Sequence, residues 1–256
     1  MIVCRSAAEL ERLARVNALV ARVLVELAAM IAPGVTTAEV DAVAERRLRE
    51  AGAEPAFKGY HGYPATICAS INEQVVHGIP SARKLVAGDI ISVDLGAKMD
   101  GFYGDSAVTV AVGPVTAVAA KLLEVTKQSL QEALSVVKAG ARLSDIGAAV
   151  QRHVEANGFS VVREFVGHGI GVTLHEEPQI PNYGTPGRGP RLAEGMVLAI
   201  EPMVNIGQAG VKVLPDGWTA VTKDGSLSAH FEHTVAVTAD GCRVLTRADA
   251  AANAAA

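Results

Sequence analysis

The chain has 256 residues, enough for one or two domains with a sizeable core. Its 23 basic and 27 acidic residues give a net charge of −4 without a long block of either sign, which argues against a nucleic-acid groove or an anionic membrane as the main partner. The three cysteines are scattered, which argues against a disulfide framework. Charged residues appear too early in the chain for a signal peptide, and no apolar run is long enough for a membrane span. We therefore expect a soluble, globular, cytoplasmic protein.

Two helices are predicted at the start of the chain. Ser6 with Glu9 and Thr36 with Glu39 both form the pattern S/T-x-x-E, which is a capping box. Apolar residues at helical spacing follow the first box, and Gly52 is placed to end the second helix.

Strands and helices then alternate once more. Glycine-rich turns and β-branched runs from about 53 to 112 predict strands, with a tight turn at Met99-Asp100-Gly101. Helical patterning returns at 115–138 and 144–157. The later predicted strands are FSVVREF, MVLAIEPMV, TAVTKDG and EHTVAVT.

The order of elements indicates an internal repeat. A shift of 106 residues aligns Gly34–Val40 with Gly140–Ile146, and a shift of 107 aligns Gly88–Asp94 with Gly195–Glu201. The second pair ends each time in a carboxylate after an apolar strand. Chance similarity in an alanine-rich chain is the alternative. We expect a duplicated α+β half, with halves at roughly 6–112 and 113–247 and an alanine-rich tail at 248–256.

Four carboxylates accompany the apolar strands. If the hairpin pairs residues that sum to 199, Asp94 and Asp105 are opposite each other, and if the sum is 201 they are diagonal. Both registers put them on one face, where like charges are destabilising unless something neutralises them. Glu201 and Glu232 lie at the ends of later strands. Each alone fits a surface carboxylate or turn residue, whereas all four together would require about two divalent cations.

Three histidines stand in glycine-rich or turn-like contexts. His168 lies in Gly-His-Gly-Ile-Gly, His175 precedes Glu-Glu-Pro, and His77 lies in Val-Val-His-Gly-Ile-Pro. A single such histidine is usually a hydrogen-bonded core residue, but three beside four suspect carboxylates favour a metal site. Neither HExxH nor GxGxxG is present. Imidazole and carboxylate ligands without a thiolate favour Fe(II), Mn(II) or Co(II) over a structural zinc.

Several of these short motifs keep a specific order and spacing. They are His77-Gly-Ile-Pro, Asp94 and Asp105 at a spacing of eleven, Gly-His168-Gly-Ile-Gly, His175-Glu-Glu-Pro, Glu201-Pro and Phe-Glu232-His-Thr. Together, from about Ser6 to Thr238, they resemble the type I methionine aminopeptidases in their short bacterial form. The resemblance implies a single catalytic domain, 1–256, with the pita-bread fold: two pseudo-symmetric α+β halves, a curved antiparallel sheet inside and helices outside.

The resemblance also implies five metal ligands and two substrate-contacting histidines. Asp94 would hold one ion, His168 and Glu201 the other, and Asp105 and Glu232 would bridge both. Glu201 would serve as the base toward a water whose pKa the paired ions lower. The substrate's free α-amine would bind near Asp94. Two histidines would contact the substrate around the scissile bond: His175, which would stabilise the oxyanion, and His77.

A methionine-sized pocket is implied as well. Positions that match the family's pocket are Tyr60, Tyr63, Cys68, His77 and Trp218. Two positions depart from it, since Leu174 stands where Phe is usual and Phe57 where Cys is common. We expect these two to alter selectivity rather than metal chemistry. A monovalent cation near Asn72, Gln74 and Ser228 is a further implication.

The expected activity is removal of the N-terminal methionine from peptides and nascent proteins when the second residue is small. The expected partners are such N-termini and the ribosome, with the chain acting as a monomer. One alternative is a pita-bread relative that cleaves X-Pro bonds, and those relatives usually add an N-terminal domain. Another is a catalytically silent binding module, which would typically lose metal ligands.

Overall fold

Four long helices form where the sequence predicts them. The computed structural model describes residues 2–248, so the predicted tail lies outside the described residues from 249 onward. Both capping boxes are present, and the backbone N–H groups of Ser6 and Thr36 each donate to their glutamate over 2.8 Å. The helices are α1 (Ala7–Met30), α2 (Thr37–Glu50), α3 (Ala117–Val136) and α4 (Leu143–Ala156), with one short 3-10 helix, η1 (Tyr60–Gly62).

The strands are antiparallel and mostly short. Those of the first half are β1 (Glu54–Pro55), β2 (Ile67–Ile71), β3 (Gln74–Val76), β4 (Ile90–Met99) and β5 (Phe102–Ala111). The others are β6 (Ser160–Val161), β7 (Gly167–Gly169), β8 (Glu176–Ile180), β9 (Val197–Ile200), β10 (Met203–Asn205), β11 (Val211–Val213), β12 (Ala220–Thr222), β13 (Ser228–His230), β14 (His233–Val237) and β15 (Cys242–Val244). FSVVREF and TAVTKDG are therefore only partly strand, because turns and bends interrupt both segments.

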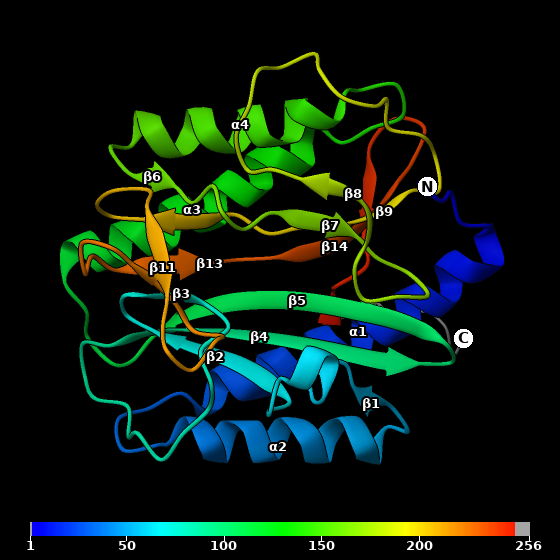
Figure 1. The fold of residues 1–256 in the computed structure, drawn as a ribbon. Coiled ribbons are helices and arrows are strands. Elements are labelled where there is room, and N and C mark those ends of the chain that lie inside the picture. Colours follow the sequence, from blue (N-terminus) through cyan, green and yellow to red (C-terminus); the bar gives the residue numbers. More distant parts are fainter. Residues whose placement is uncertain (1, 249–256) are drawn as a thin grey trace.

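The strands lie in the middle of the molecule and the helix pairs lie outside them (Figure 1). Helices α1 and α2 cover one side, and α3 and α4 cover the other. β4 pairs with β1, β2 and β5 in one sheet, and a second sheet has the order β15-β14-β9-β7-β8. Two three-stranded sheets, β13-β10-β6 and β11-β12-β3, complete the layer.

Corresponding hydrogen bonds recur in the two halves. Gly34 N–H donates to the Leu85 carbonyl over 2.8 Å, and Gly140 N–H donates to the Leu192 carbonyl over 2.8 Å. An isolated bridge pairs Thr36 with Lys84, and a second pairs Arg142 with Arg191. These contacts are related by the same shifts of 106 and 107 residues that align the sequence. They support the proposed halves, whose boundaries stay a prediction.

The hairpin β4–β5 adopts the register in which the two aspartates are diagonal. Asp94 pairs with Ala107, and Asp105 pairs with Gly96. The connection is the two-residue turn Asp100-Gly101, with φ angles of 52° and 82°. Two consecutive left-handed residues define a type I′ turn, whose twist matches that of the strands. The turn thus fixes the register and puts both carboxylates on one face.

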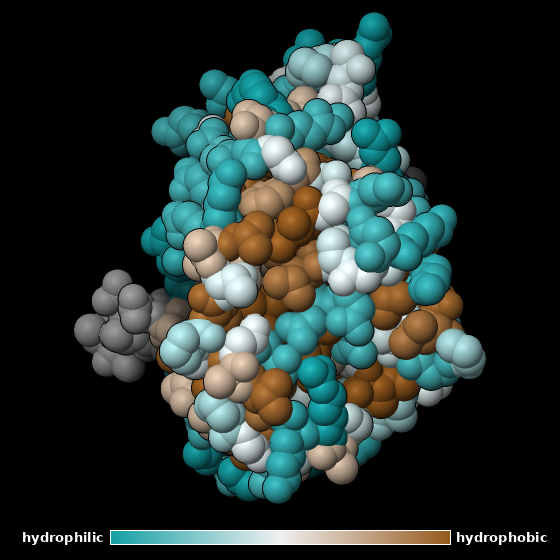
Figure 2. Space-filling model, turned by 90° about the vertical axis from the view of Figure 1, so that its left-hand side faces the viewer, coloured by the Kyte–Doolittle hydropathy of each residue, from teal (hydrophilic) through white to brown (hydrophobic). Residues whose placement is uncertain are grey.

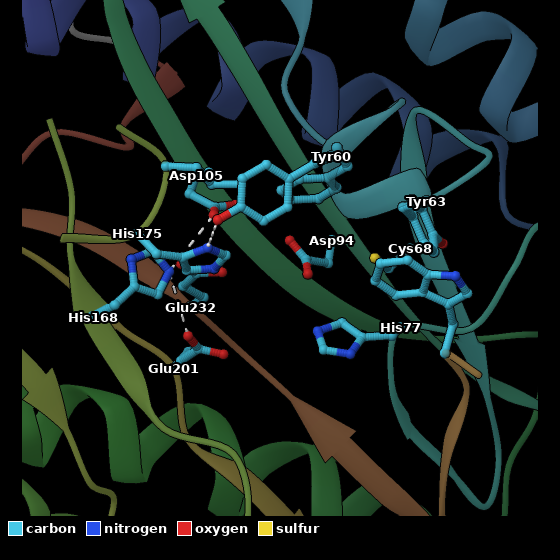
Figure 3. Close-up of a pocket in the computed structure, with 13 residues that line it drawn as sticks. Tyr60, Tyr63, Cys68, His77, Asp94, Asp105, His168, His175, Glu201 and Glu232 are labelled. Atoms are coloured by element: carbon cyan, nitrogen blue, oxygen red, sulfur yellow. Dashed lines mark hydrogen bonds and ion pairs between the residues drawn. The ribbon is translucent and has the colours of Figure 1, made fainter. Parts of the chain in front are cut away.

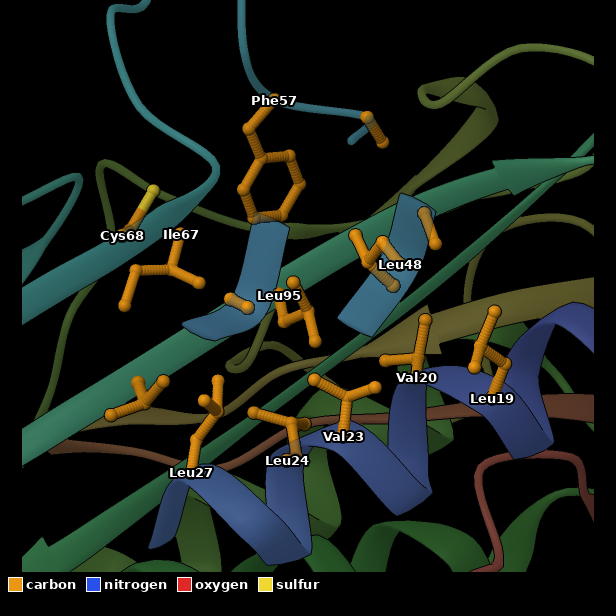
Figure 4. Close-up of a cluster of buried hydrophobic side chains, with 14 of the residues drawn as sticks. Leu19, Val20, Val23, Leu24, Leu27, Leu48, Phe57, Ile67, Cys68 and Leu95 are labelled. Carbon is orange, nitrogen blue, oxygen red and sulfur yellow. The ribbon is translucent and has the colours of Figure 1, made fainter. Parts of the chain in front are cut away.

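Each helix pair buries an apolar face against the strands. In the first half, one face of α1 packs beneath Leu95 of β4, close to Leu48 of α2 and Ile67 of β2 (Figure 4). In the second half, Leu122 and Leu130 of α3 and Ile146 of α4 pack with Leu198 of β9. The two helix pairs thus pack into separate apolar clusters. Full burial of one leucine or isoleucine side chain in such a cluster stabilises the fold by about 1.5–3 kcal/mol.

One face of the molecule exposes apolar residues. Figure 2 shows them gathered at the centre of that face, around a hollow, with hydrophilic residues above and below.

Among residues 2–248, no helix has the length and apolar character needed to cross a membrane.

The left-handed conformation of Gly101 predicts the effect of Gly101→Ala. A side chain at φ 82° is strained, so this change should lower the free energy of unfolding by about 1 kcal/mol. Urea denaturation of the two proteins measures the difference. Asp100→Asn is the matched control, because asparagine tolerates the left-handed region, and should change stability by less than about 0.5 kcal/mol. Equal stability of Gly101→Ala and the parent would contradict the turn assignment.

Candidate metal centre and substrate pocket

One cavity of about 180 Å³ lies between the two halves (Figure 3). Every predicted metal ligand and substrate-pocket residue lines it, whereas the predicted monovalent-cation residues do not. The lining residues are Phe57, Tyr60, Tyr63, Cys68, His77, Asp94, Asp105, His168, Leu174, His175, Glu201, Trp218 and Glu232.

Acidic and histidine side chains meet at one end of this cavity. Asp105 of β5, His168 of β7 and Glu232, just before β14, each offer a ligand atom, and these atoms lie within 4.8 Å of one another. Glu201 follows β9, and its Oε1 lies 3.7 Å from His168 Nε2. Asp94 of β4 lines the same cavity. Both halves therefore contribute to the cluster, as the repeat predicts.

Hydrogen bonds hold the backbone around Asp105 and Glu232. Buried Asn17 of α1 accepts from the Asp105 N–H through its Oδ1 over 3.2 Å, and the Thr234 hydroxyl donates to the Asp105 carbonyl over 2.8 Å. The Ser106 hydroxyl donates to the Glu232 carbonyl over 2.7 Å. β5 and the start of β14 are thus fastened together across the boundary between the halves.

Burial makes the carboxylates hard to ionise. It raises the pKa of Asp94 to about 7, and raises the pKa of Asp105 and of Glu232 well above the usual range, with the neighbouring carboxylates adding to the effect. At Glu201 burial acts in the same direction, but the hydrogen bond with His230 and the electrostatic influence of the neighbouring histidines outweigh it, so the pKa of Glu201 lies below its usual value.

The cluster fits divalent cations. Within residues 2–248, Asp94 Oδ1, Asp105 Oδ1 and Glu232 Oε1 are buried atoms without a hydrogen-bond donor. The Nδ1 atom of His168 lies 2.9 Å from the Gly169 carbonyl, which fixes the tautomer that leaves Nε2 as an acceptor. Buried charges are normally paired or coordinate a metal, and this donor set suits a cation rather than an apolar or anionic ligand.

The other two predicted histidines lie at the same cavity. The Tyr60 hydroxyl is 2.8 Å from Nδ1 of His175, whose ring centroid is 4.3 Å from that of His168. Burial and the neighbouring His168 lower the pKa of His175 to about 4. His77 has a left-handed φ of 60° and also has a pKa lowered by burial. Both rings are therefore neutral near neutral pH.

Aromatic and apolar side chains form the other end of the cavity. Tyr63 is buried and donates to the carbonyls of Ile67 and Gly78, so its ring is fixed. Trp218 contacts it edge-to-face at 5.1 Å between ring centroids. Cys68 is opposite Asp94 in the sheet, and burial raises the pKa of its thiol. This end of the cavity suits an apolar side chain.

Two residues beside the site, His230 and Phe165, are not among those predicted from the sequence. His230 is buried, and its Nε2 lies 3.4 Å from Glu201 Oε2. Its separation of two residues from Glu232 was an available signal, since residues i and i+2 of an extended segment share a face. Phe165 contacts His77 edge-to-face at 5.3 Å. No motif marked Phe165, because only the fold brings it to His77.

The predicted monovalent-cation residues are partly brought together. The Ser228 N–H donates to the Asn72 carbonyl over 2.9 Å, which places these two side by side. The Gln74 side chain accepts from the Ile71 N–H over 2.8 Å and is engaged locally. The cation itself stays a prediction.

The chain matches the model of Metallopeptidase family M24 over residues 11–239. The chain belongs to this family. Methionine aminopeptidase 1 of Bacillus subtilis is 54% identical over 96% of this chain and 100% of that protein. A second relative, methionine aminopeptidase 1 of Mycobacterium tuberculosis, is 49% identical over 94% of each chain.

Solved structures agree with this M24 assignment. The methionine aminopeptidase from Thermotoga maritima has a TM-score of 0.95, with 47% identity over 96% of this chain and 100% of that one. Prolidase from Pyrococcus furiosus shares the fold at a TM-score of 0.78 but only 22% identity, and the match covers 65% of that chain. The predicted pita-bread α+β fold, the methionine aminopeptidase resemblance and the assignment as a hydrolytic enzyme are confirmed.

The buried charges of this M24 site predict the effect of Asp105→Asn. Asparagine needs neither a buried charge nor the uptake of a proton in the folded state, so the metal-free variant should be more stable near neutral pH by about 1 kcal/mol or more, a rise of roughly 2–4 °C in thermal midpoint. The same variant should lose most of the stabilisation that Mn(II) gives the parent protein.

Thermal unfolding with chelator and with Mn(II) measures both effects. Exposed Asp240 supplies the control, and Asp240→Asn should alter neither midpoint. A metal-free Asp105→Asn protein that is less stable than its parent would show that burying the Asp105 carboxyl group costs no stability.

Proposed function

We propose that this chain removes the N-terminal methionine from peptides and nascent proteins whose second residue is small, using two divalent metal ions. One observation carries the proposal: a cluster of acidic and histidine side chains and an apolar, aromatic-walled pocket share one cavity. An exopeptidase needs this adjacency, because the side chain it selects is attached directly to the bond it cleaves. The family and the names of the relatives support the same reading.

The proposed ligands divide between the two ions. Asp94 would hold one ion, His168 and Glu201 would hold the other, and Asp105 and Glu232 would contribute to both. Fe(II), Mn(II) and Co(II) are the candidates, because the donors are oxygen and imidazole without sulfur. Such ions supply Lewis acidity and lower the pKa of a bound water, which is the chemistry that amide hydrolysis requires.

The protein's own groups position the peptide and move protons. Glu201, which keeps an ionised carboxylate, is the proposed base. His175 is neutral and is oriented by Tyr60, so its Nε2–H is directed as a hydrogen-bond donor toward developing charge on the carbonyl oxygen. His77 lies between the acidic cluster and Trp218 and is placed to orient the amide nitrogen of the scissile bond.

Pocket selectivity rests on the fixed walls. Tyr63, Cys68 and Trp218 surround an unbranched side chain, and Leu174 and Phe57 set the width of the pocket. Ribosome association, a cytoplasmic location and a monomeric state follow from the family resemblance and stay predictions.

Hydrolysis of Met-Ala-Ser tests the activity directly. The protein should release free methionine, and thorough metal removal should reduce the rate by about 100-fold or more, with recovery on addition of Mn(II) or Co(II). Released methionine is quantified by chromatography. Activity that survives thorough metal removal would contradict the proposal. Ala-Pro serves as the control substrate, because its cleavage would instead indicate an X-Pro peptidase.

Leu174→Phe tests the substrate pocket. Leu174 is 2% exposed and lines the cavity, and an aromatic ring there would gain a contact with the thioether sulfur. Such contacts contribute about 0.3–1.5 kcal/mol, so the preference for Met- over norleucine-peptides should rise by about two- to tenfold in kcat/KM. Val213→Phe, on the surface, is the control. An unchanged ratio would remove Leu174 from the selectivity argument.

A further inference from the structure

The N-terminal segment crosses from one half of the molecule to the other. Arg5 precedes Ser6, the N-cap of α1, yet its backbone N–H donates to the Gly195 carbonyl in the connection between β8 and β9 over 2.7 Å. Figure 1 shows this N-terminal segment beside that connection. The first helix of one half is therefore tied to the strands of the other.

The side chain of Arg5 forms a buried ion pair with Glu176. The Arg5 side chain is 6% exposed and that of Glu176 is 14% exposed, and Arg5 Nη2 donates to Glu176 Oε2. Glu9 Oε1 lies 3.9 Å from Arg5 Nη1, but the other oxygen of Glu9 is used by the Ser6 cap. Glu176 is thus the main partner of Arg5.

Glu176 closes the turn that carries His175. Its Oε1 accepts from the Val172 N–H over 2.8 Å and from the Thr173 N–H over 3.2 Å. One carboxylate therefore binds both the start of this turn and Arg5. Because His175 is the preceding residue, its backbone position depends on where Glu176 is held.

Gly171 leaves room for the same arginine. A Cβ atom at this position would overlap the Arg5 guanidinium. The Gly171 carbonyl also accepts from the Tyr103 N–H over 2.8 Å, two residues before Asp105. The last glycine of Gly-His168-Gly-Ile-Gly and the first glutamate of His175-Glu-Glu-Pro therefore form one cradle for Arg5.

We propose that Arg5 is a positioning residue for His175, and this rests on the proposed role of His175 in peptide hydrolysis. Tyr60 holds the His175 ring at Nδ1, and Arg5 holds the His175 backbone through Glu176. Tyr60 therefore acts on the side chain of His175, and Arg5 acts on its backbone. Without Arg5 the turn loses its anchor, and the ring moves away from the Tyr60 hydroxyl.

Arg5→Gln tests this coupling. The kcat for Met-Ala-Ser should fall by about tenfold or more, while KM changes by less than about threefold, because a misplaced group acts on the transition state. In the metal-free protein near neutral pH, the ¹⁵N shifts of His175 should move from those of one fixed tautomer toward the average of two. Arg5→Lys should restore part of the kcat and part of the parent ¹⁵N shifts of His175.

The matched control is Arg15→Gln. Arg15 lies on α1, the helix that follows Arg5, and pairs with Asp100 at the surface over 3.3 Å, so its loss should change neither kcat nor the His175 shifts. Glu176→Gln gives a second variant, because the amide oxygen still accepts from Val172 and Thr173 while the charge facing Arg5 is gone. It should reproduce the kcat and NMR effects of Arg5→Gln in part.

A purely structural role would give a different pattern. If Arg5→Gln and Glu176→Gln lower the thermal midpoint but leave kcat and the His175 shifts unchanged, the positioning proposal is wrong. If the parent protein itself fails to hydrolyse Met-Ala-Ser, the proposed function fails, and the His175 shifts still decide whether Arg5 positions this ring.

Discussion

The structure depends on four carboxylates that are buried together where the two halves meet. Asp94 and Asp105 come from one half, and Glu201 and Glu232 come from the other. Like charges at such depth oppose folding unless they are protonated or neutralised by a cation. The side chains of Ser106, Thr234 and Asn17 hold the backbone around them and leave carboxylate oxygens facing the cavity. The fold thus holds four carboxyl groups in a place where their burial lowers stability, and their free oxygens can bind the cations that hydrolysis requires.

This arrangement places both the acidic cluster and the apolar wall of the cavity on rigid elements. The acidic residues lie on or beside paired strands, and the apolar wall is fixed by the hydrogen bonds of Tyr63 and by its contact with Trp218. His77 and His175 lie on connecting segments, and His175 has an additional anchor in the Tyr60 hydroxyl. Positioning a reacting group within a fraction of an ångström requires support of this kind around each side chain.

Local signals in the sequence predicted much of this molecule. The capping boxes at Ser6 and Thr36 depend only on neighbouring residues, and the Asp100-Gly101 turn specifies its own geometry. The spacing of the motifs singled out the four carboxylates and three histidines of the cavity, and the family resemblance supplied its aromatic and apolar residues. The hairpin register follows from the two-residue turn Asp100-Gly101, and the position of His230 two residues before Glu232 was also a local signal. The shortness of β6 and the approach of Phe165 and Arg5 were beyond reach, because they depend on tertiary packing between distant segments.

The central claim is that the acidic and histidine cluster holds two divalent ions. An anomalous difference map from crystals grown with Mn(II), recorded at the manganese absorption edge, tests it most directly. The account predicts two peaks in the cavity, one beside Asp94 and one beside His168 and Glu201, with Asp105 and Glu232 next to both. A map with no peak in the cavity, or with peaks only elsewhere on the protein, would contradict it.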